Sequence, residues 1–169
     1  MLEDGVTGTP AVDVSPRATL ILPPGVRDNS AAIWMGGARS LGGHHVALNR
    51  MRTAWLVETA GDMPAAFHEM ARNTLFCVFA DTEEVPSVID RIRDTAVRVA
   101  DAARLQASAP TDVYIVCSQG LNRSGLVTGL VLRQLGMAGS AAVDLIRSAR
   151  PGALSNHAFE GLVLGETAL

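Results

Sequence analysis

The stretch VCSQGLNRSG, residues 116–125, joins two apolar segments through a short polar loop. The run Val113–Val116 before it is continuously apolar, which is typical of a strand buried on both faces of a parallel sheet. After the loop, apolar residues recur at helical spacing from Leu126 to Leu135. The pattern predicts a strand, a tight loop and a helix. In that arrangement, the loop N–H groups and the helix dipole favour a bound anion.

Cys117 and Arg123 lie at the two ends of this loop. The field that favours an anion also favours the thiolate form of a cysteine, so Cys117 is a candidate nucleophile. Arg123 offers a planar fork that matches two oxygens of a phosphate and can stabilise charge on a phosphoryl group. Gly120 allows the loop to fold around the anion, and the Ser124 hydroxyl can hydrogen-bond the sulfur when it leaves. The spacing therefore predicts a phosphate site with a cysteine nucleophile.

A second buried strand is predicted at Leu75–Ala80, and a helix over Pro86–Gln106 connects it to the first. If the two strands are parallel, their carboxyl ends open on the same edge of the sheet, where α/β proteins bind ligands. Asp81 follows this strand, which makes it the expected proton donor to the leaving group, although a loop or capping carboxylate before the helix is the alternative. Three other carboxylates are weaker candidates because none directly follows a buried strand: Asp62, Glu83 and Glu84.

The length of 169 residues and the hydrophobic content of 48% predict one α/β domain with a central, mostly parallel sheet flanked by helices. Residues 1–17 lack periodicity and are expected to be a loose N-terminal arm before a domain at 18–169. Further short strands are expected at Thr19–Leu22, Ala32–Met35 and Ala54–Val57.

Composition argues against several classes of protein. The net charge of −3 and the lack of a basic face give no sign of a nucleic-acid surface. No apolar stretch is long enough to span a bilayer, and the start of the chain does not resemble a signal peptide, so we expect a cytoplasmic protein. We also expect a monomer. Two cysteines and four histidines without ligand spacing predict neither a metal site nor a cofactor.

The order of Cys117, five residues, Arg123 and Ser124 resembles the signature of the cysteine-dependent protein tyrosine phosphatase superfamily, specifically its dual-specificity branch. Asp81 precedes the cysteine by a distance similar to that of the general acid in this branch. RPGALSNHAF, residues 150–159, resembles its arginine-proline, asparagine and phenylalanine element, and IWMGGARSL, residues 33–41, resembles its early strand and turn. The resemblance covers roughly residues 31–160.

The resemblance implies a metal-independent phosphate monoesterase that works through a cysteinyl-phosphate. It implies that Cys117 is the nucleophile, that Asp81 acts as acid and then as base, and that Arg123 clamps the phosphate. It also implies that Ser124 assists thiol release and that Asn156 supports the loop. Read from the residues alone, Asn156 is equally well a helix cap, and Ser155 is the expected cap of the last helix. The residues expected to bind substrate are Ser118, Gln119, Gly120, Leu121, Asn122 and Arg123.

The chain departs from the branch at Val116, where histidine is usual. The loop contains no lysine, so highly charged phosphoinositides are not favoured. The leading substrate is a phosphorylated protein. The alternatives are a small-molecule, lipid or nucleic-acid phosphomonoester, or a catalytically inactive phosphate-binding module. Cys77 is expected to be a buried core residue; the alternative is a redox partner that captures oxidised Cys117 as a disulfide.

Overall fold

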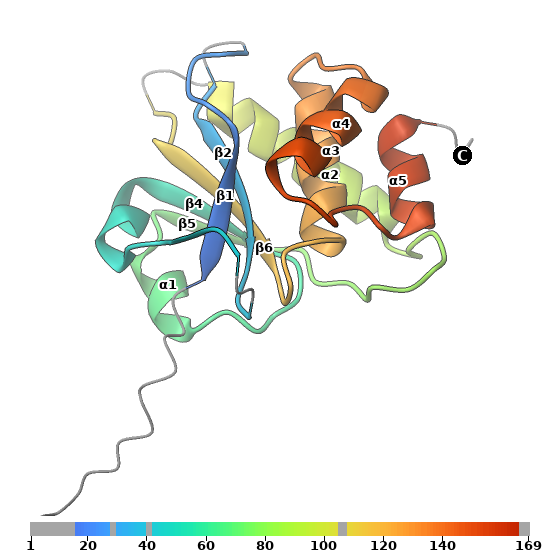
Figure 1. Cartoon of the computed structure of the whole chain (residues 1–169). Coiled ribbons are helices and arrows are strands. Elements are labelled where there is room, and N and C mark those ends of the chain that lie inside the picture. Colours follow the sequence, from blue (N-terminus) through green and yellow to red (C-terminus); the bar gives the residue numbers. More distant parts are fainter. Residues whose placement is uncertain (1–15, 28–29, 40–41, 105–107, 166–169) are drawn as a thin grey trace, which may run out of the picture.

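A six-stranded mixed sheet forms the centre of the molecule, with strand order β3-β1-β2-β6-β4-β5 (Figure 1). The structure is a computed structural model and describes residues 16–27, 30–39, 42–104 and 108–165. Strands β2, β6, β4 and β5 pair in parallel, whereas β1 pairs antiparallel with β2 and β3. The strands span Arg17–Leu22 (β1), Ala32–Gly37 (β2), His44–His45 (β3), Ala54–Glu58 (β4), Asn73–Phe76 (β5) and Asp112–Cys117 (β6).

Helices cover both faces of the sheet and confirm the predicted α/β class (Figure 1). One face packs against four helices, and the apolar cluster between them includes Ile115 and Leu126. The opposite face packs a smaller cluster, including Tyr114 and Phe67, under two short helices. The larger layer contains α2 (Ile89–Arg104), α3 (Arg123–Gln134), α4 (Gly139–Ala149) and α5 (His157–Leu164), and the smaller layer contains η1 (Leu48–Thr53) and α1 (Ala65–Met70).

Strand β6 is buried along its whole length, as its continuous apolar run predicts. Its neighbour β4 sets Glu58 level with Val116, and β5 sets Phe76 level with Glu58. Because these strands are parallel and in register, the segments that follow them all emerge at one edge of the sheet. That edge carries the loop after Cys117.

The prediction of a strand at Leu75–Ala80 buried on both faces is wrong in extent and in burial. Strand β5 is only Asn73–Phe76, and it lies at the edge of the sheet with β4 as its single strand partner. The extended chain continues beyond it, because Cys77 N–H donates to the carbonyl of Glu58. This extended segment packs against the core on one face only, so Cys77 is buried while Phe76 and Val78, on the other face, remain exposed.

Strand β1 begins at Arg17, and residues 1–15 of the predicted arm lie outside the described residues. Within the described ranges, no helix has both the length and the apolar character needed to cross a membrane.

Candidate active site

The loop between β6 and α3 surrounds the sulfur of Cys117 with hydrogen-bond donors. The side chain is 3% exposed at the end of β6. Its Sγ accepts the Gly120 N–H at 3.1 Å and lies 3.2 Å from the Oγ of the fully buried Ser124. A backbone N–H and a hydroxyl therefore both contact the sulfur. The structure thus brings together the residues at which the sequence predicts the nucleophile and its hydroxyl partner.

Glycines on two segments allow the loop to lie directly against the end of β2. Gly120 has a φ of +71°, and a Cβ on it would lie 2.5 Å from the carbonyl carbon of Gly36. A Cβ on Gly37 would lie 2.5 Å from the carbonyl carbon of Gln119. Two backbone hydrogen bonds join the segments, including that from Ala38 N–H to the Cys117 carbonyl at 2.9 Å. Larger residues at either glycine would separate β2 from the loop.

Arg123 begins α3 and directs its guanidinium toward the loop. Its Nη2 donates to Ser118 Oγ at 3.2 Å, and its Nη1 donates to the Phe79 carbonyl at 3.4 Å. Its Nε is buried and has no hydrogen-bond partner among the residues described. A buried donor without an acceptor is unfavourable, and an anion in the loop would satisfy it.

Arg150 supports the loop from behind, a role that the sequence reading did not assign. The side chain is buried; its Nε donates to the Gly120 carbonyl at 2.6 Å, and its Nη2 donates to the Gln119 carbonyl at 3.3 Å. Its Nη1 donates to Thr19 Oγ1 at 2.9 Å. Burial lowers the pKa of Arg150, and negative charge on Cys117 opposes that change. The arginine-proline element was the signal for this role in the sequence. If its arginine is buried, it needs several acceptors, and the carbonyls of the loop supply them.

Asp81 lies beside the loop on the segment that follows β5. Its Oδ1 accepts from Asn156 Nδ2 at 2.9 Å, and its Oδ2 accepts from Asn122 Nδ2 at 3.2 Å. The side chain is otherwise exposed to solvent. By contrast, Glu83 and Glu84 are exposed and make no hydrogen bond to the loop in the described part of the chain. Of these three carboxylates, Asp81 is the one that hydrogen-bonds a residue of the loop.

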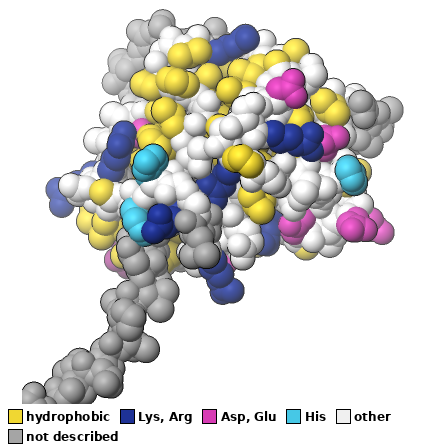
Figure 2. Space-filling view, in the orientation of Figure 1, with side chains coloured by type: hydrophobic (Ala, Val, Ile, Leu, Met, Phe, Trp, Pro, Cys, Tyr) yellow, Lys and Arg dark blue, Asp and Glu magenta, His cyan; other side chains and the backbone are white. Residues whose placement is uncertain are grey.

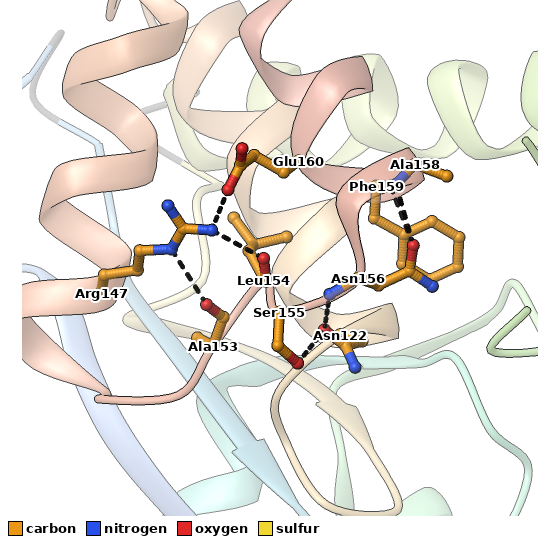
Figure 3. A network of polar contacts seen from close by, with 9 residues as sticks. All are labelled: Asn122, Arg147, Ala153, Leu154, Ser155, Asn156, Ala158, Phe159 and Glu160. Atoms are coloured by element: carbon orange, nitrogen blue, oxygen red, sulfur yellow. Dashed lines mark hydrogen bonds and ion pairs between the residues drawn. The ribbon is translucent and has the colours of Figure 1, made fainter. Parts of the chain in front are cut away.

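Asn156 combines the two functions that the sequence left open (Figure 3). Its Oδ1 caps α5 by accepting from Ala158 N–H at 3.1 Å and Phe159 N–H at 3.2 Å. Its backbone N–H donates to Asn122 Oδ1 at 3.0 Å, and its Nδ2 holds Asp81. The prediction that Ser155 caps this helix is wrong, because the Ser155 hydroxyl lies 3.3 Å from Asn122 Oδ1 instead.

Arg147 holds the segment between α4 and α5 against the loop (Figure 3). Its Nε donates to the Ala153 carbonyl at 3.3 Å, its Nη2 donates to the Leu154 carbonyl at 2.8 Å, and it forms an ion pair with Glu160. Leu154 has a φ of 56°, which is uncommon for a side chain of its size, and its N–H donates to the Leu121 carbonyl at 3.1 Å. The strained residue thus sits where the segment meets the loop.

Asp62 contacts the loop more directly than its low rank in the sequence suggests. It follows β4 by four residues, and its Oδ2 accepts the Ser118 hydroxyl at 2.6 Å. It also forms an ion pair with Arg39 at 3.6 Å. Because β4 lies next to β6, a residue that follows it reaches the loop even without directly ending the strand. The apolar run Ala54–Val57 was the signal in the sequence, because it predicts the strand that Asp62 follows.

Val116 packs in the smaller apolar cluster. Its carbonyl accepts two hydrogen bonds from Thr59, from the backbone N–H at 2.9 Å and from Oγ1 at 2.7 Å. Thr59 directly follows β4, so these bonds tie the backbone at the start of the loop to the end of that strand.

Cys77 is completely buried in the main core, and both cysteines are free thiols. The strand register places Cys77 and Cys117 on either side of the chain continuing from β4, two strand spacings or about 10 Å apart. A disulfide needs Cα atoms about 4–7 Å apart. The redox pairing stays a prediction, and it requires backbone movement around Thr59.

Comparison with known proteins identifies the fold. No protein-family model matches the sequence, and no curated protein matches it. Human DUSP28 superposes with a TM-score of 0.65 at 21% identity, over 89% of this chain and 92% of its own. A mouse putative dual specificity phosphatase complexed with zinc tungstate gives 0.63 at 20% identity, over 89% and 86%. The human tyrosine phosphatase-like serine/threonine/tyrosine-interacting protein gives 0.60 at 17% identity, over 88% and 93%.

These similarities show that the chain has the fold of the dual-specificity phosphatases. They confirm, for the fold, the resemblance that the loop sequence indicates. The single α/β domain and the placement of a loop between a central strand and a helix both agree with that fold.

Proposed function

We propose that this chain hydrolyses phosphate monoesters through a cysteinyl-phosphate intermediate, as a phosphatase of the protein tyrosine or dual-specificity type. The observation that carries the proposal is that one loop holds the Cys117 sulfur, in contact with the Gly120 N–H and the Ser124 hydroxyl, and the buried Nε of Arg123, which has no partner among the described residues. A nucleophile and an open cationic donor on one loop suit an incoming phosphoryl group.

The reaction proceeds in two displacements at phosphorus. The Cys117 thiolate attacks the phosphorus and forms the S–P bond, while the ester P–O bond breaks and Asp81 gives its proton to the leaving oxygen. Asp81 then takes a proton from water, whose oxygen attacks phosphorus and releases the Cys117 thiolate. Ser124 donates a hydrogen bond to the departing sulfur, and Arg123 holds the phosphoryl oxygens throughout.

The substrate we favour is a phosphorylated protein; the similarity in fold to a putative dual specificity phosphatase supports this choice. The face in Figure 2 carries interspersed basic and acidic side chains, and all 14 basic residues of the chain are arginine. The absence of lysine from the loop gives no preference for polyphosphorylated lipids. A small-molecule, lipid or nucleic-acid monoester remains the alternative substrate, and a cytoplasmic monomer remains the expected state. A phosphopeptide panel measured beside small phosphomonoesters separates the substrates.

A catalytically inactive phosphate-binding module is the alternative function. Asp81 accepts hydrogen bonds on both oxygens, from Asn122 and Asn156, and it must exchange one of them for a proton before it can act as the acid. Its exposed position leaves room for that change.

The test is hydrolysis of an aryl phosphate from pH 4 to 9, with chelator present, by the wild type and by Cys117→Ser. We expect a bell-shaped profile, because the thiol must be deprotonated while the acid is protonated, and a loss of at least ~10³-fold in the variant. Cys77→Ala is the matched control and should retain activity. Phosphate binding without turnover by the wild type would establish the binding module instead.

A further inference from the structure

We propose that Asp62 is a positioning residue for Arg123, acting through the hydroxyl of Ser118; the inference rests on the proposed phosphate site. The three side chains form a continuous chain of hydrogen bonds. Arg123 Nη2 donates to Ser118 Oγ at 3.2 Å, and Ser118 Oγ donates to Asp62 Oδ2 at 2.6 Å. Asp62 thereby orders the Arg123 side chain indirectly, through Ser118.

The chemistry of the two ends sets the direction of these bonds. A guanidinium only donates hydrogen bonds, so Ser118 Oγ must accept from Arg123. The single Ser118 proton must then go to another acceptor, and an ionised carboxylate is the strongest acceptor available. With Asp62 present, the lone pairs of the hydroxyl are held toward Arg123. Without Asp62, the hydroxyl is free to rotate.

Asp62 is itself held in place by a buried carboxylate. Glu58 ends β4 and is completely buried; its Oε1 accepts the Met63 N–H at 2.8 Å, and its Oε2 contacts Nε2 of His68. These contacts fix both ends of the short segment that carries Asp62, from the end of β4 to the start of α1. The position of the Asp62 carboxylate that accepts from Ser118 is therefore fixed before any ligand binds.

The result for Arg123 is a guanidinium fixed at two corners. The Phe79 carbonyl holds Nη1 and the Ser118 hydroxyl holds Nη2, whereas the buried Nε is a guanidinium nitrogen with no partner among the described residues. A planar group held at two points has a fixed orientation, so less conformational freedom is lost when phosphate binds.

The charge on Asp62 is a further argument for a positioning function. A carboxylate next to a phosphate-binding loop repels the ligand, so on charge alone it would weaken binding. Its ion pair with Arg39 offsets little of this, because that side chain is 72% exposed. A hydrogen bond that orders the phosphate-binding arginine supplies the compensating gain.

The first test measures inorganic phosphate affinity by calorimetry in the Cys117→Ser background, so that no turnover is needed. Asp62→Ala should weaken phosphate binding about 10- to 100-fold, the range for losing a hydrogen bond to a charged group. Asp62→Asn keeps an acceptor oxygen without the charge and should restore most of the affinity. Glu69→Gln removes an exposed carboxylate from the neighbouring helix α1 and should change nothing.

The second test is a double-mutant cycle with Ser118→Ala. If Asp62 acts through Ser118, Asp62→Ala should add little once Ser118 is alanine, so the effects should be strongly non-additive. In the active enzyme, Asp62→Asn should leave both limbs of the pH–rate profile in place, since Asp62 transfers no proton. Circular dichroism and urea midpoints verify that each variant is folded.

Three results would overturn the inference: additive effects in the cycle, tighter phosphate binding in Asp62→Ala, or loss of a pH limb in Asp62→Asn. The first would make Asp62 a local structural residue, the second a purely repulsive charge, and the third a proton donor. An inactive wild type whose phosphate affinity still depends on Asp62 would refute the proposed catalysis and leave the inference standing.

Discussion

The two ends of strand β6 differ in how far their polar groups are satisfied. At the start, both oxygens of the buried Asp112 are used: Oδ1 accepts from Trp34 Nε1 at 2.8 Å, and Oδ2 accepts from Arg50 Nε at 3.2 Å. At the other end, beyond Cys117, the Nε of Arg123 is buried without a partner. The satisfied end contributes to stability, whereas the open end carries the phosphate site that we propose.

The largest expected effect at the open end, after loss of the nucleophile, comes from Asp81. Asp81→Asn should lower turnover by roughly 10²–10⁴ for an ester whose leaving group needs protonation. It should also flatten the alkaline limb of the rate profile, because that limb reports the need for a protonated acid. Stability should hardly change, since Asp81 is exposed. Steady-state kinetics from pH 4 to 9 and urea unfolding give the two readings.

An unchanged alkaline limb in Asp81→Asn would assign the acid elsewhere. Asp62 would then be the first candidate, because it also contacts the loop. Glu84→Gln is a matched control from the same segment, and it should retain the full profile.

At the satisfied end, Asp112→Ala should act on stability and leave turnover per folded molecule unchanged. The buried Asp112 carboxylate is lost, and the Nε1–H of the half-buried Trp34 loses its acceptor, so the free energy of unfolding should fall by about 1–3 kcal/mol. The Arg50 contact adds little to this, because that side chain is about half exposed. Urea unfolding measures the effect; an equal loss of turnover in the folded protein would show that the two ends are coupled.

The smallest expected effect is a pH dependence of stability from Tyr114. Burial, and next the charge of Asp112, raise the pKa of Tyr114 from 10.0 to about 12. The unfolded chain then loses this proton at lower pH than the folded chain, so stability present below pH 10 should decline between about pH 10 and 12. Over that range, the urea midpoint of the wild type should fall relative to that of Tyr114→Phe if the phenol is responsible. Parallel curves would exclude it.

Local sequence patterns were enough to predict most of the sheet and the phosphate loop. The run Val113–Val116 and the helical spacing after Leu126 are short-range signals, because burial of a strand or of a helix face is written in consecutive residues. The loop residues from Cys117 to Arg123 are adjacent in the chain, so their chemistry could also be read directly.

Contacts between distant segments could not be predicted in the same way. The extent of β5 was misjudged because an apolar run does not show whether a strand has one neighbour or two. Asp62 and Arg150 lie 56 and 30 residues from the loop residues they contact. No periodicity links such residues, so their contacts become visible only once the order of the strands is known.

The loop, its nucleophile and its arginine follow from the amino-acid sequence, because the spacing of these residues is set by one strand, one turn and one helix. The surroundings of the loop depend on the tertiary structure. Parallel pairing brings the ends of β4 and β5 to the edge where β6 ends, and the crossing from α4 to α5 places Arg150 and Asn156 behind the loop. Long-range packing alone decides which polar groups at this edge are satisfied and which remain open for phosphate.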